Sequence, residues 1–371
     1  MFKEEDVINK FIELTQIDSE SYNEREIADK LKKELLELGL KVNEDDAGDV
    51  IENNTGNIIA KLKGNEPSLP KLLLSAHMDT VKPGKSIEPV VEDGIIFSQG
   101  DTILGADDKA GITMILTILR ELKDSQSSYG DIEVVFTVCE EAGLLGSKNL
   151  AFKNLNADYG IVCDSGESVG NIIIEGPAQT KIKAKVYGKA AHAGKEPYKG
   201  INAIKVAGVA LANMELGQID EETTANIGIV KGGEATNIVP DEVELVGEVR
   251  SRDEAKLEEQ VQSIIKTLEE AAEEFDTDVE TEVKRLFPSF KLDKELSIIK
   301  LAIEAGENLG LEPKLIATGA GSDANIFNAQ EIPTINFGLG TKEGHTADEN
   351  IETDNFTKIV KLILDIIQNL D

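Results

Sequence analysis

The fold is decided by residues 71–80, KLLLSAHMDT, in which a short apolar run ends at His77 and Asp79. Turn-forming residues bound the run, with Pro70 before it and Pro83 after it. An apolar run of this length between turns predicts a buried strand. Open α/β sheets bind ligands at the carboxyl ends of their strands, so His77 and Asp79 lie where a functional site is expected. A core histidine beside a turn-capping aspartate fits this stretch equally well.

Length and composition indicate a folded chain of two domains. At 371 residues the chain exceeds the usual size of one domain, and its 40% hydrophobic content is enough for substantial cores. The net charge of −32 argues against a nucleic acid or an anionic membrane as partner, since both bind basic surfaces. Much of the acidic excess lies in segments such as Asp253–Phe275, where it predicts a solvated helix face.

The sequence shows no pattern of secretion or membrane insertion. Residues 1–6 are acidic and lack the layout of a signal peptide, which is basic and then apolar. The longest apolar helical stretch, around Ile112–Leu119, is too short to span a bilayer. Cys139 and Cys163 lie in apolar strand-like runs and form neither a disulfide framework nor a Cys-x-x-Cys motif. We therefore expect a cytoplasmic enzyme.

Two adjacent aspartates, Asp107 and Asp108, lie at the start of the apolar helix Ile112–Leu122. Capping of the helix would account for one of them but not for the pair. Glycines on both sides, Gly105 and Gly111, would let a partner approach the backbone. The pair is therefore a second candidate for a functional site.

Three further predicted strands lead to side chains that bind metals. They are Asp131–Cys139 with Glu140 and Glu141, Ala157–Cys163 with Asp164, and Pro333–Gly338 with His345. Adjacent carboxylates at the end of a buried strand repel each other and are costly to desolvate unless a cation is present. Two histidines with three or four carboxylates suit two borderline divalent ions that share one carboxylate, and zinc fits such ligands best. The acidic loop Asn43–Asp49 lacks the ligand spacing of an EF-hand and is expected to be solvated.

Residues 176–290 have a different character and separate the two halves of this set. Their predicted elements follow the order β-α-β-β-α-β, which is typical of a ferredoxin-like domain. These elements are the strand Thr180–Tyr187, the helix Ala203–Met214, the strands Ile227–Lys231 and Glu242–Arg250, the helix Glu254–Phe275 and the strand Val279–Leu286. We therefore expect an α/β fold in which a mixed sheet flanked by helices, residues 1–175 and 291–371, is interrupted by an α+β insert.

Five motifs now occur in order along the chain. They are His77-Met78-Asp79, Gly105-Ala106-Asp107-Asp108-Lys109, Glu140-Glu141-Ala142-Gly143, Asp164 and Gly344-His345. In order and spacing this set resembles the di-zinc metallopeptidase family of peptidase T, carboxypeptidase G and aminoacylase, and most of all its peptidase T-like members. The resemblance covers essentially the whole chain. It implies a zinc-exopeptidase-like catalytic domain with an inserted lid and dimerisation domain.

The resemblance also implies a site for two divalent ions, Zn²⁺ first, with Co²⁺ or Mn²⁺ as alternatives. Asp107 would bridge the two ions. His77 and Asp164 would complete the ligands of one ion, and Glu141 and His345 those of the other. Two ions that share a ligand lie about 3.5–4 Å apart and lower the pKa of a water that bridges them.

Two further carboxylates would act beside the ions. Asp79 would orient the imidazole of His77, as carboxylates commonly do for histidine ligands. Glu140 would be the general base, which takes a proton from the bridging water and returns it to the leaving amine.

Within the insert, His192 matches a lid histidine that stabilises the tetrahedral oxyanion in relatives, often across a dimer. We therefore expect a homodimer through the insert. Asn237 and Arg250 match lid positions that hold substrate. Tripeptidases of this family carry an arginine where this chain has Gly319, which argues against a strict preference for tripeptides. Ser322, close by, could offer a hydrogen bond to a substrate.

These residues predict metal-dependent hydrolysis of amide bonds in short peptides by an aminopeptidase or a tripeptidase-like exopeptidase. An N-acyl-amino-acid deacylase would use the same ligands, so an N-acyl amino acid is the alternative substrate. A protein that binds metal without catalysis would need the ligands but not Glu140. We expect neither nucleic acid nor a membrane as partner.

Overall fold

The computed structural model describes residues 2–371, which form two compact units. Unit 1 comprises the described residues up to Ile174, with Lys291–Ala317 and Ser322–Asp371, and unit 2 comprises Glu175–Phe290 and Thr318–Gly321. Two hydrogen bonds join the short segment to the rest of unit 2: Thr318 N donates to Glu175 O at 2.9 Å, and the side-chain Nη1 of Arg250 donates to Gly319 O at 3.4 Å. Unit 2 therefore contains residues 318–321 in addition to the insert expected at 176–290.

A mixed sheet forms the centre of unit 1, as predicted. Within residues 2–371 it has nine strands in the order β1-β2-β6-β3-β7-β16-β8-β14, with β15 paired to β8. The bounds are β1 Lys41–Glu44, β2 Ile58–Leu62, β3 Leu72–His77, β6 Ile132–Thr137, β7 Tyr159–Val162, β8 Asn171–Gly176, β14 Phe290–Lys291, β15 Lys314–Ala317 and β16 Thr334–Phe337. β3 is parallel to β6 and β7, and β16 is parallel to β7, whereas β1, β2 and β8 run antiparallel to a neighbour.

The parallel strands bring their carboxyl ends to one edge of this sheet. The strand predicted at 71–76 is β3, which continues through His77 and is buried along its whole length. His77 pairs with Thr137, the last residue of β6, and Ser75 pairs with Val162, the last residue of β7. The segments that follow β3, β6 and β7 therefore leave the sheet at neighbouring points.

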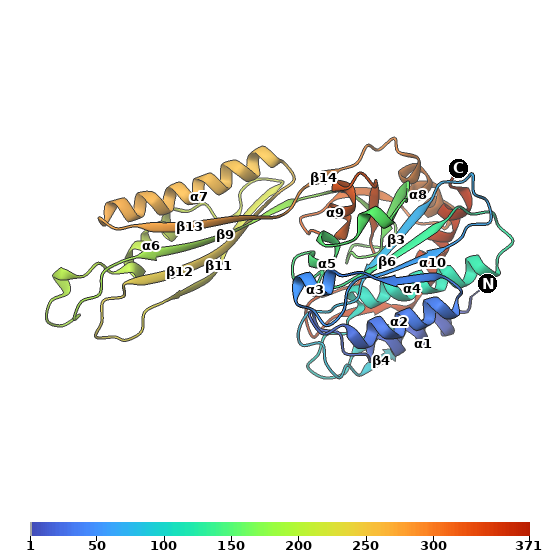
Figure 1. Cartoon of the computed structure of the whole chain (residues 1–371), viewed down its shortest axis with the longest axis horizontal. Coiled ribbons are helices and arrows are strands. Elements are labelled where there is room, and N and C mark those ends of the chain that lie inside the picture. Colours follow the sequence, from blue (N-terminus) through green and yellow to red (C-terminus); the bar gives the residue numbers. More distant parts are fainter. Residues whose placement is uncertain (1) are drawn as a thin grey trace. The chain divides into compact units, whose positions relative to one another are not determined.

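Helices flank the sheet (Figure 1). Their bounds are α1 Glu4–Thr15, α2 Arg25–Glu37, α3 Ala47–Ile51, α4 Ala106–Asp124, α5 Leu145–Lys148, α8 Ser297–Asn308, α9 Asp323–Ala329 and α10 Thr353–Asn369. α4 packs on β3 and against α1 and α10, and α9 packs on β7 and β16. The rings of Phe11 in α1 and Phe356 in α10 are both buried, with 4.9 Å between their centroids. No helix in the described part of the chain combines the length and apolar character needed to cross a bilayer.

A small sheet joins unit 1 near the candidate site. It has the order β17-β5-β4, with bounds β4 Pro89–Glu92, β5 Ile95–Ser98 and β17 Asn350–Glu352. β17 pairs antiparallel with β5, so residues 350–352 are anchored at 95–97. The segment that carries His345 therefore ends in a fixed strand.

The prediction of a solvated acidic loop at Asn43–Asp49 is correct only in part, because Asp46 and Asp49 are exposed whereas Glu44 and Asp45 are partly buried. The segment contains the end of β1 and the start of α3. The Glu44 carboxylate pairs with Arg25 and, at 2.8 Å, with Lys32 Nζ. Asp45 Oδ1 accepts a hydrogen bond from Asn57 N at 2.9 Å. Glu44 and Asp45 are therefore paired with cations and amides of neighbouring segments instead of with solvent alone.

Unit 2 has the predicted β-α-β-β-α-β order with one short added strand. Its bounds are β9 Ala178–Tyr187, α6 Ala203–Asn213, β10 Gly217–Gln218, β11 Thr223–Gly232, β12 Glu242–Ser251, α7 Glu254–Glu274 and β13 Val279–Phe287. The strands form an antiparallel sheet in the order β10-β11-β12-β9-β13. α6 and α7 pack on it with buried side chains such as Val206, Leu257 and Ile264, as in a ferredoxin-like domain (Figure 1).

Candidate metal centre

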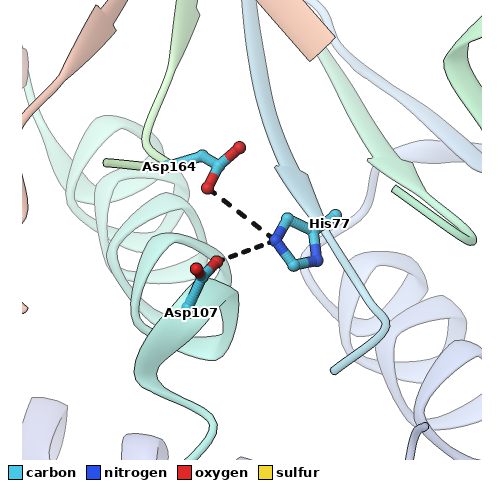
Figure 2. Close-up of side chains that lie close together, drawn as sticks. All are labelled: His77, Asp107 and Asp164. Carbon is cyan, nitrogen blue, oxygen red and sulfur yellow. Dashed lines mark hydrogen bonds and ion pairs between the residues drawn. The ribbon is translucent and has the colours of Figure 1, made fainter. Parts of the chain in front are cut away.

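Three side chains from different elements of unit 1 meet around the imidazole of His77. His77 is the last residue of β3, Asp107 lies at the start of α4, and Asp164 follows β7. The Nε2 atom of His77 is 2.9 Å from Asp107 Oδ1 and 3.8 Å from Asp164 Oδ1. Figure 2 shows both carboxylates turned toward the same ring nitrogen. The three ligand atoms lie within 4.8 Å of one another, which is close enough to hold one ion.

A second group of three uses the other oxygen of Asp107. The Nε2 atom of His345 is 3.2 Å from Asp107 Oδ2 and 2.9 Å from Glu141 Oε1. These three ligand atoms also lie within 4.8 Å of one another. Asp107 is thus common to both groups, one oxygen to each, which is the arrangement expected for two ions that share a bridging carboxylate.

The backbone adopts unusual conformations at or next to several of these ligands. Asp107 and Asp108 are non-helical although they lie within α4, with φ/ψ of −83°/100° at Asp107. Cys139, directly before the two glutamates, has φ 48°, and His345 has φ 65°. Non-glycine residues rarely adopt positive φ, and such conformations persist where the surrounding contacts over-determine them. The chain is therefore turned at the points where it presents a candidate ligand.

Asp79 contacts His77 chiefly through its backbone. Its carbonyl oxygen lies 2.8 Å from His77 Nδ1, whereas its Oδ1 atom lies 3.4 Å away. The carboxylate accepts hydrogen bonds from Glu140 N at 2.9 Å, Glu141 N at 3.3 Å and Ser21 Oγ at 2.7 Å. The side chain of Asp79 therefore holds the backbone of the Glu140–Glu141 turn, a contact that sequence spacing does not indicate.

The electrostatics of the site favour a bound cation. Burial acts to lower the pKa of His77, but hydrogen bonds with Asp107 and Asp79 raise that pKa well above its ordinary value. Hydrogen bonds with Asp107 and Glu141 raise the pKa of His345 to about 10. Burial, with Asp107 and Glu140 nearby, raises the pKa of Asp164. Negative charge is thus in excess, and histidine and carboxylate ligands of this kind fit borderline divalent ions such as Zn²⁺.

Glu140 is buried beside these groups without belonging to either. Burial, with the nearby charges of Asp323 and Glu141, raises the pKa of its carboxyl group. Asp323, the first residue of α9, accepts a hydrogen bond from Thr137 Oγ1 at 2.5 Å. A carboxyl group with a raised pKa is suited to exchange protons near neutral pH.

Several residues that support the ligands were not found from the sequence. Asn336 in β16 fixes the backbone of Asp164, since its Oδ1 accepts from Asp164 N at 3.1 Å and its Nδ2 donates to Asp164 O at 3.0 Å. Glu24 Oε1 accepts from Cys139 N at 3.0 Å. Asp108 Oδ2 accepts from His77 N at 3.1 Å, so the second aspartate of the pair stabilises backbone. No motif marks such roles, because the contacts go to main-chain atoms of distant segments.

The insert residues His192 and Asn237 lie on adjacent loops of unit 2. His192 is exposed and forms a bridge with Ile238, and Ala193 N donates to Asn237 O at 2.9 Å. The Nδ1 atom of His192 accepts from Gly194 N at 3.1 Å. The loop of His192 follows β9, which ends at Tyr187. The loop of Asn237 precedes β12, which begins at Glu242, the residue paired with Tyr187.

Arg250 lies at the other end of the same sheet. It pairs with Gln179 at the start of β9, and its Nε donates to Glu248 Oε1 at 2.9 Å. From Gln179 to Tyr187 the strand spans roughly 26 Å at about 3.3 Å per residue. Arg250 and His192 are therefore not brought together within one chain.

Ser322 is buried and acts as a helix cap in unit 1. It is the N-cap of α9 and forms a capping box with Asn325, whose Oδ1 accepts from Ser322 N at 3.0 Å. Its Oγ accepts from Asn336 Nδ2 at 3.3 Å. The hydroxyl group is thus engaged with the protein, between α9 and the backbone of Asp164.

Comparisons with known proteins agree with this geometry. The family model described as peptidase family M20/M25/M40 matches residues 73–369. Protein YqjE of Bacillus subtilis (strain 168) is 42% identical over 368 residues, which cover 99% of each chain. The solved structure of aminopeptidase PepT from Bacillus cereus ATCC 10987 is 41% identical, with a TM-score of 0.91 and 99% of each chain covered.

A second solved structure is similar over its whole length. The tripeptidase from Staphylococcus aureus subsp. aureus mu50 is 41% identical, with a TM-score of 0.96 and coverage of 100% of this chain and 99% of that one. Identity at this level over the full length shows membership of the family and not only a shared fold. The chain belongs to peptidase family M20/M25/M40, and within it is a peptidase T-like metallopeptidase.

Proposed function

We propose that this protein is a two-ion exopeptidase that removes residues from the amino end of short peptides. The observation that carries the proposal is the pair of ligand groups, His77 and Asp164 on one side and Glu141 and His345 on the other, which share Asp107. When bound, the two cations would supply Lewis-acid polarisation of the scissile carbonyl group and would lower the pKa of a water between them. Zn²⁺ is the first candidate, and Co²⁺ or Mn²⁺ could occupy the same ligands.

Glu140 is the proposed proton carrier. Its carboxyl group is buried next to Glu141 but outside both ligand groups, so it remains available to accept and return a proton. Burial raises its pKa, which brings proton transfer closer to neutral pH. It would take a proton from the attacking water and deliver it to the nitrogen of the leaving amine. Asp79 supports this role by holding the Glu140 amide.

We propose that His192 serves the site of another chain in a homodimer. The end of β9 near His192 and the end that pairs with Arg250 are roughly 26 Å apart at about 3.3 Å per residue, whereas an extended tripeptide spans only about 10 Å. If both residues contact one short substrate, they must come from different chains. Mixed dimers of His192→Ala and Glu140→Gln chains test this, because each inactive chain supplies what the other lacks. Mixing should restore activity, and a fully active monomer would contradict the proposal.

The substrate proposal favours free short peptides over N-acylated amino acids, and it includes no strict tripeptide preference. Gly319 has no side chain that could bind a peptide carboxylate. The guanidinium group of Arg250 lies beside it and donates to its carbonyl oxygen at 3.4 Å. Arg250 is therefore the cation proposed to bind the substrate carboxylate near Gly319. Asn237, on the loop next to His192, would contribute to substrate binding from that end of the unit 2 sheet. Ser322 is the weaker assignment, since its hydroxyl group already accepts from Asn336.

A panel of free and N-acylated di-, tri- and tetrapeptides tests the substrate class. Free peptides should be cleaved at the first bond, with dipeptides and tripeptides both accepted. Glu140→Gln should retain both ions and lose about 10²–10⁴-fold in turnover, the range for one general acid–base group. Cleavage of N-acylated substrates alone would overturn the aminopeptidase proposal. Fractionation of cells expressing the protein tests the proposed cytoplasmic location.

A further inference from the structure

Glu349 connects the two halves of the metal centre although neither ligand group includes it. Its side chain is 1% exposed. The Oε1 atom accepts a hydrogen bond from Asp107 N at 3.0 Å, and Oε2 accepts from Gly105 N at 2.7 Å. Both donors belong to the turn that presents the shared ligand, Asp107. A carboxylate that accepts two charge-assisted hydrogen bonds in a buried place fixes its donors firmly.

Glu349 also ends the loop that carries His345, which contacts Asp107 in the second ligand group. The loop is closed by paired hydrogen bonds, Lys342 N to Asn350 O at 2.9 Å and Asn350 N to Lys342 O at 3.0 Å. His345 itself is half exposed and has φ 65°. Because Glu349 lies directly before Asn350, its carboxylate attaches this exposed loop to the buried start of α4.

A buried lysine attaches the start of α4 to a third segment. Lys109, in the first turns of α4, is fully buried, and its Nζ donates to Ile17 O at 2.6 Å. The start of α4, the loop of His345 and the segment around Ile17 are thus connected through Lys109 and Glu349.

We propose that Glu349 is a positioning residue that sets the distance between Asp107 and His345 and so the affinity of the ion held by Asp107, Glu141 and His345. The proposal rests on the two-ion function above. Loss of the Glu349 carboxylate releases the Asp107 amide and the His345 loop together. The ion bound by His77, Asp107 and Asp164 loses only the first of these supports. The affinity for the ion held by Asp107, Glu141 and His345 should therefore fall more than the affinity for the other ion.

Titration of ion-free protein with Co²⁺ in the presence of a competing chelator, followed by visible absorption, tests the proposal. The wild type should bind two ions. Glu349→Gln keeps the size of the side chain and one acceptor oxygen, and it should lower the affinity for the ion held by Asp107, Glu141 and His345 about 10-fold. Glu349→Ala should lower that affinity about 100-fold. Both values lie within the range for residues that orient metal ligands. A simple folding defect would weaken the binding of both ions alike, whereas the positioning role predicts the larger loss for the ion held by Asp107, Glu141 and His345.

A matched control separates positioning from capping in general. Asp253 accepts from Ala255 N at 2.8 Å and Lys256 N at 3.1 Å at the start of α7 in unit 2. Asp253→Ala removes the same number of hydrogen bonds from a helix start and should leave both Co²⁺ affinities unchanged. If both Glu349 variants bind two ions with wild-type affinity, the positioning role is overturned. If the wild type itself binds fewer than two ions, it is the proposed function that fails.

Discussion

Replacing Asp79 by alanine removes the acceptor for three hydrogen bonds at the centre of the site. Two of the donors are backbone amides, that of the buried residue Glu140 and that of the partly buried residue Glu141, and the third is the hydroxyl group of Ser21. A buried donor left without a partner costs about 1–3 kcal/mol. The Glu140 amide therefore predicts a loss of about 1–3 kcal/mol in the free energy of unfolding of the ion-free protein, and the partly buried Glu141 amide adds a smaller amount. Ser21 is partly exposed and can donate to water instead.

Urea unfolding of ion-free protein, followed by far-UV circular dichroism, measures this loss. Ser21→Ala is the matched control, because it removes one hydrogen bond to the same carboxylate and leaves both amides paired. It should cost about 1 kcal/mol. Asp79→Asn keeps one acceptor oxygen and should fall between the two. An Asp79→Ala protein within about 0.5 kcal/mol of the wild type would refute the claim that this carboxylate holds the Glu140–Glu141 turn.

Three further outcomes are expected. Phe356→Ala leaves a cavity against the ring of Phe11 and should lower the free energy of unfolding by about 3–5 kcal/mol; a loss below about 1 kcal/mol would contradict the packing of α1 on α10. Hydrogen bonds from Arg25 and Lys32 outweigh burial and hold the pKa of Glu44 well below its ordinary value, so this group stabilises the fold above about pH 4–5 and the stabilisation is lost as the pH falls further. The free energies of unfolding of wild type and Glu44→Gln, measured in urea, should differ by about 1–3 kcal/mol at pH 7 and converge toward pH 2. Removing the ions with a chelator should abolish peptide cleavage and lower the unfolding temperature, because each ion present at 100 times its dissociation constant stabilises by about 2.7 kcal/mol; an unchanged unfolding temperature would contradict ion binding by the folded state.

The positions of the ligands could be predicted from the sequence because each follows a simple element. An apolar run is a buried strand, and parallel strands bring their carboxyl ends to one edge. His77, Asp164 and the Glu140–Glu141 pair needed only that rule to be placed together. His345 could be added only by the family resemblance, since no local pattern tells where the residues after β16 return.

Residues that act through backbone hydrogen bonds could not be predicted. Glu349 was visible four positions after His345, but its partners are amides 242 and 244 positions away in sequence. Asn336 and Glu24 act in the same way on Asp164 and Cys139. A carboxylate or amide that accepts from main-chain atoms leaves no pattern in the residues it contacts, because every residue except proline carries the same donor.

The insert shows a different limit of sequence reasoning. His192 and Arg250 are both expected to contact substrate, and Arg250 lies in β12, the strand predicted at Glu242–Arg250. Only the register of β9 with β12 reveals that they belong to opposite ends of one sheet. Register depends on tertiary contacts, so no reading of either segment alone could have separated them.

The number of zinc ions bound per chain tests the central claim, a site of two ions that share Asp107. Zinc should be measured after equilibrium with excess ion and removal of the unbound fraction. The account predicts two ions in the wild type, one in Asp164→Asn and one in Glu141→Gln, and neither ion retained in Asp107→Ala. One ion per wild-type chain, or two ions retained by Asp107→Ala, would contradict it.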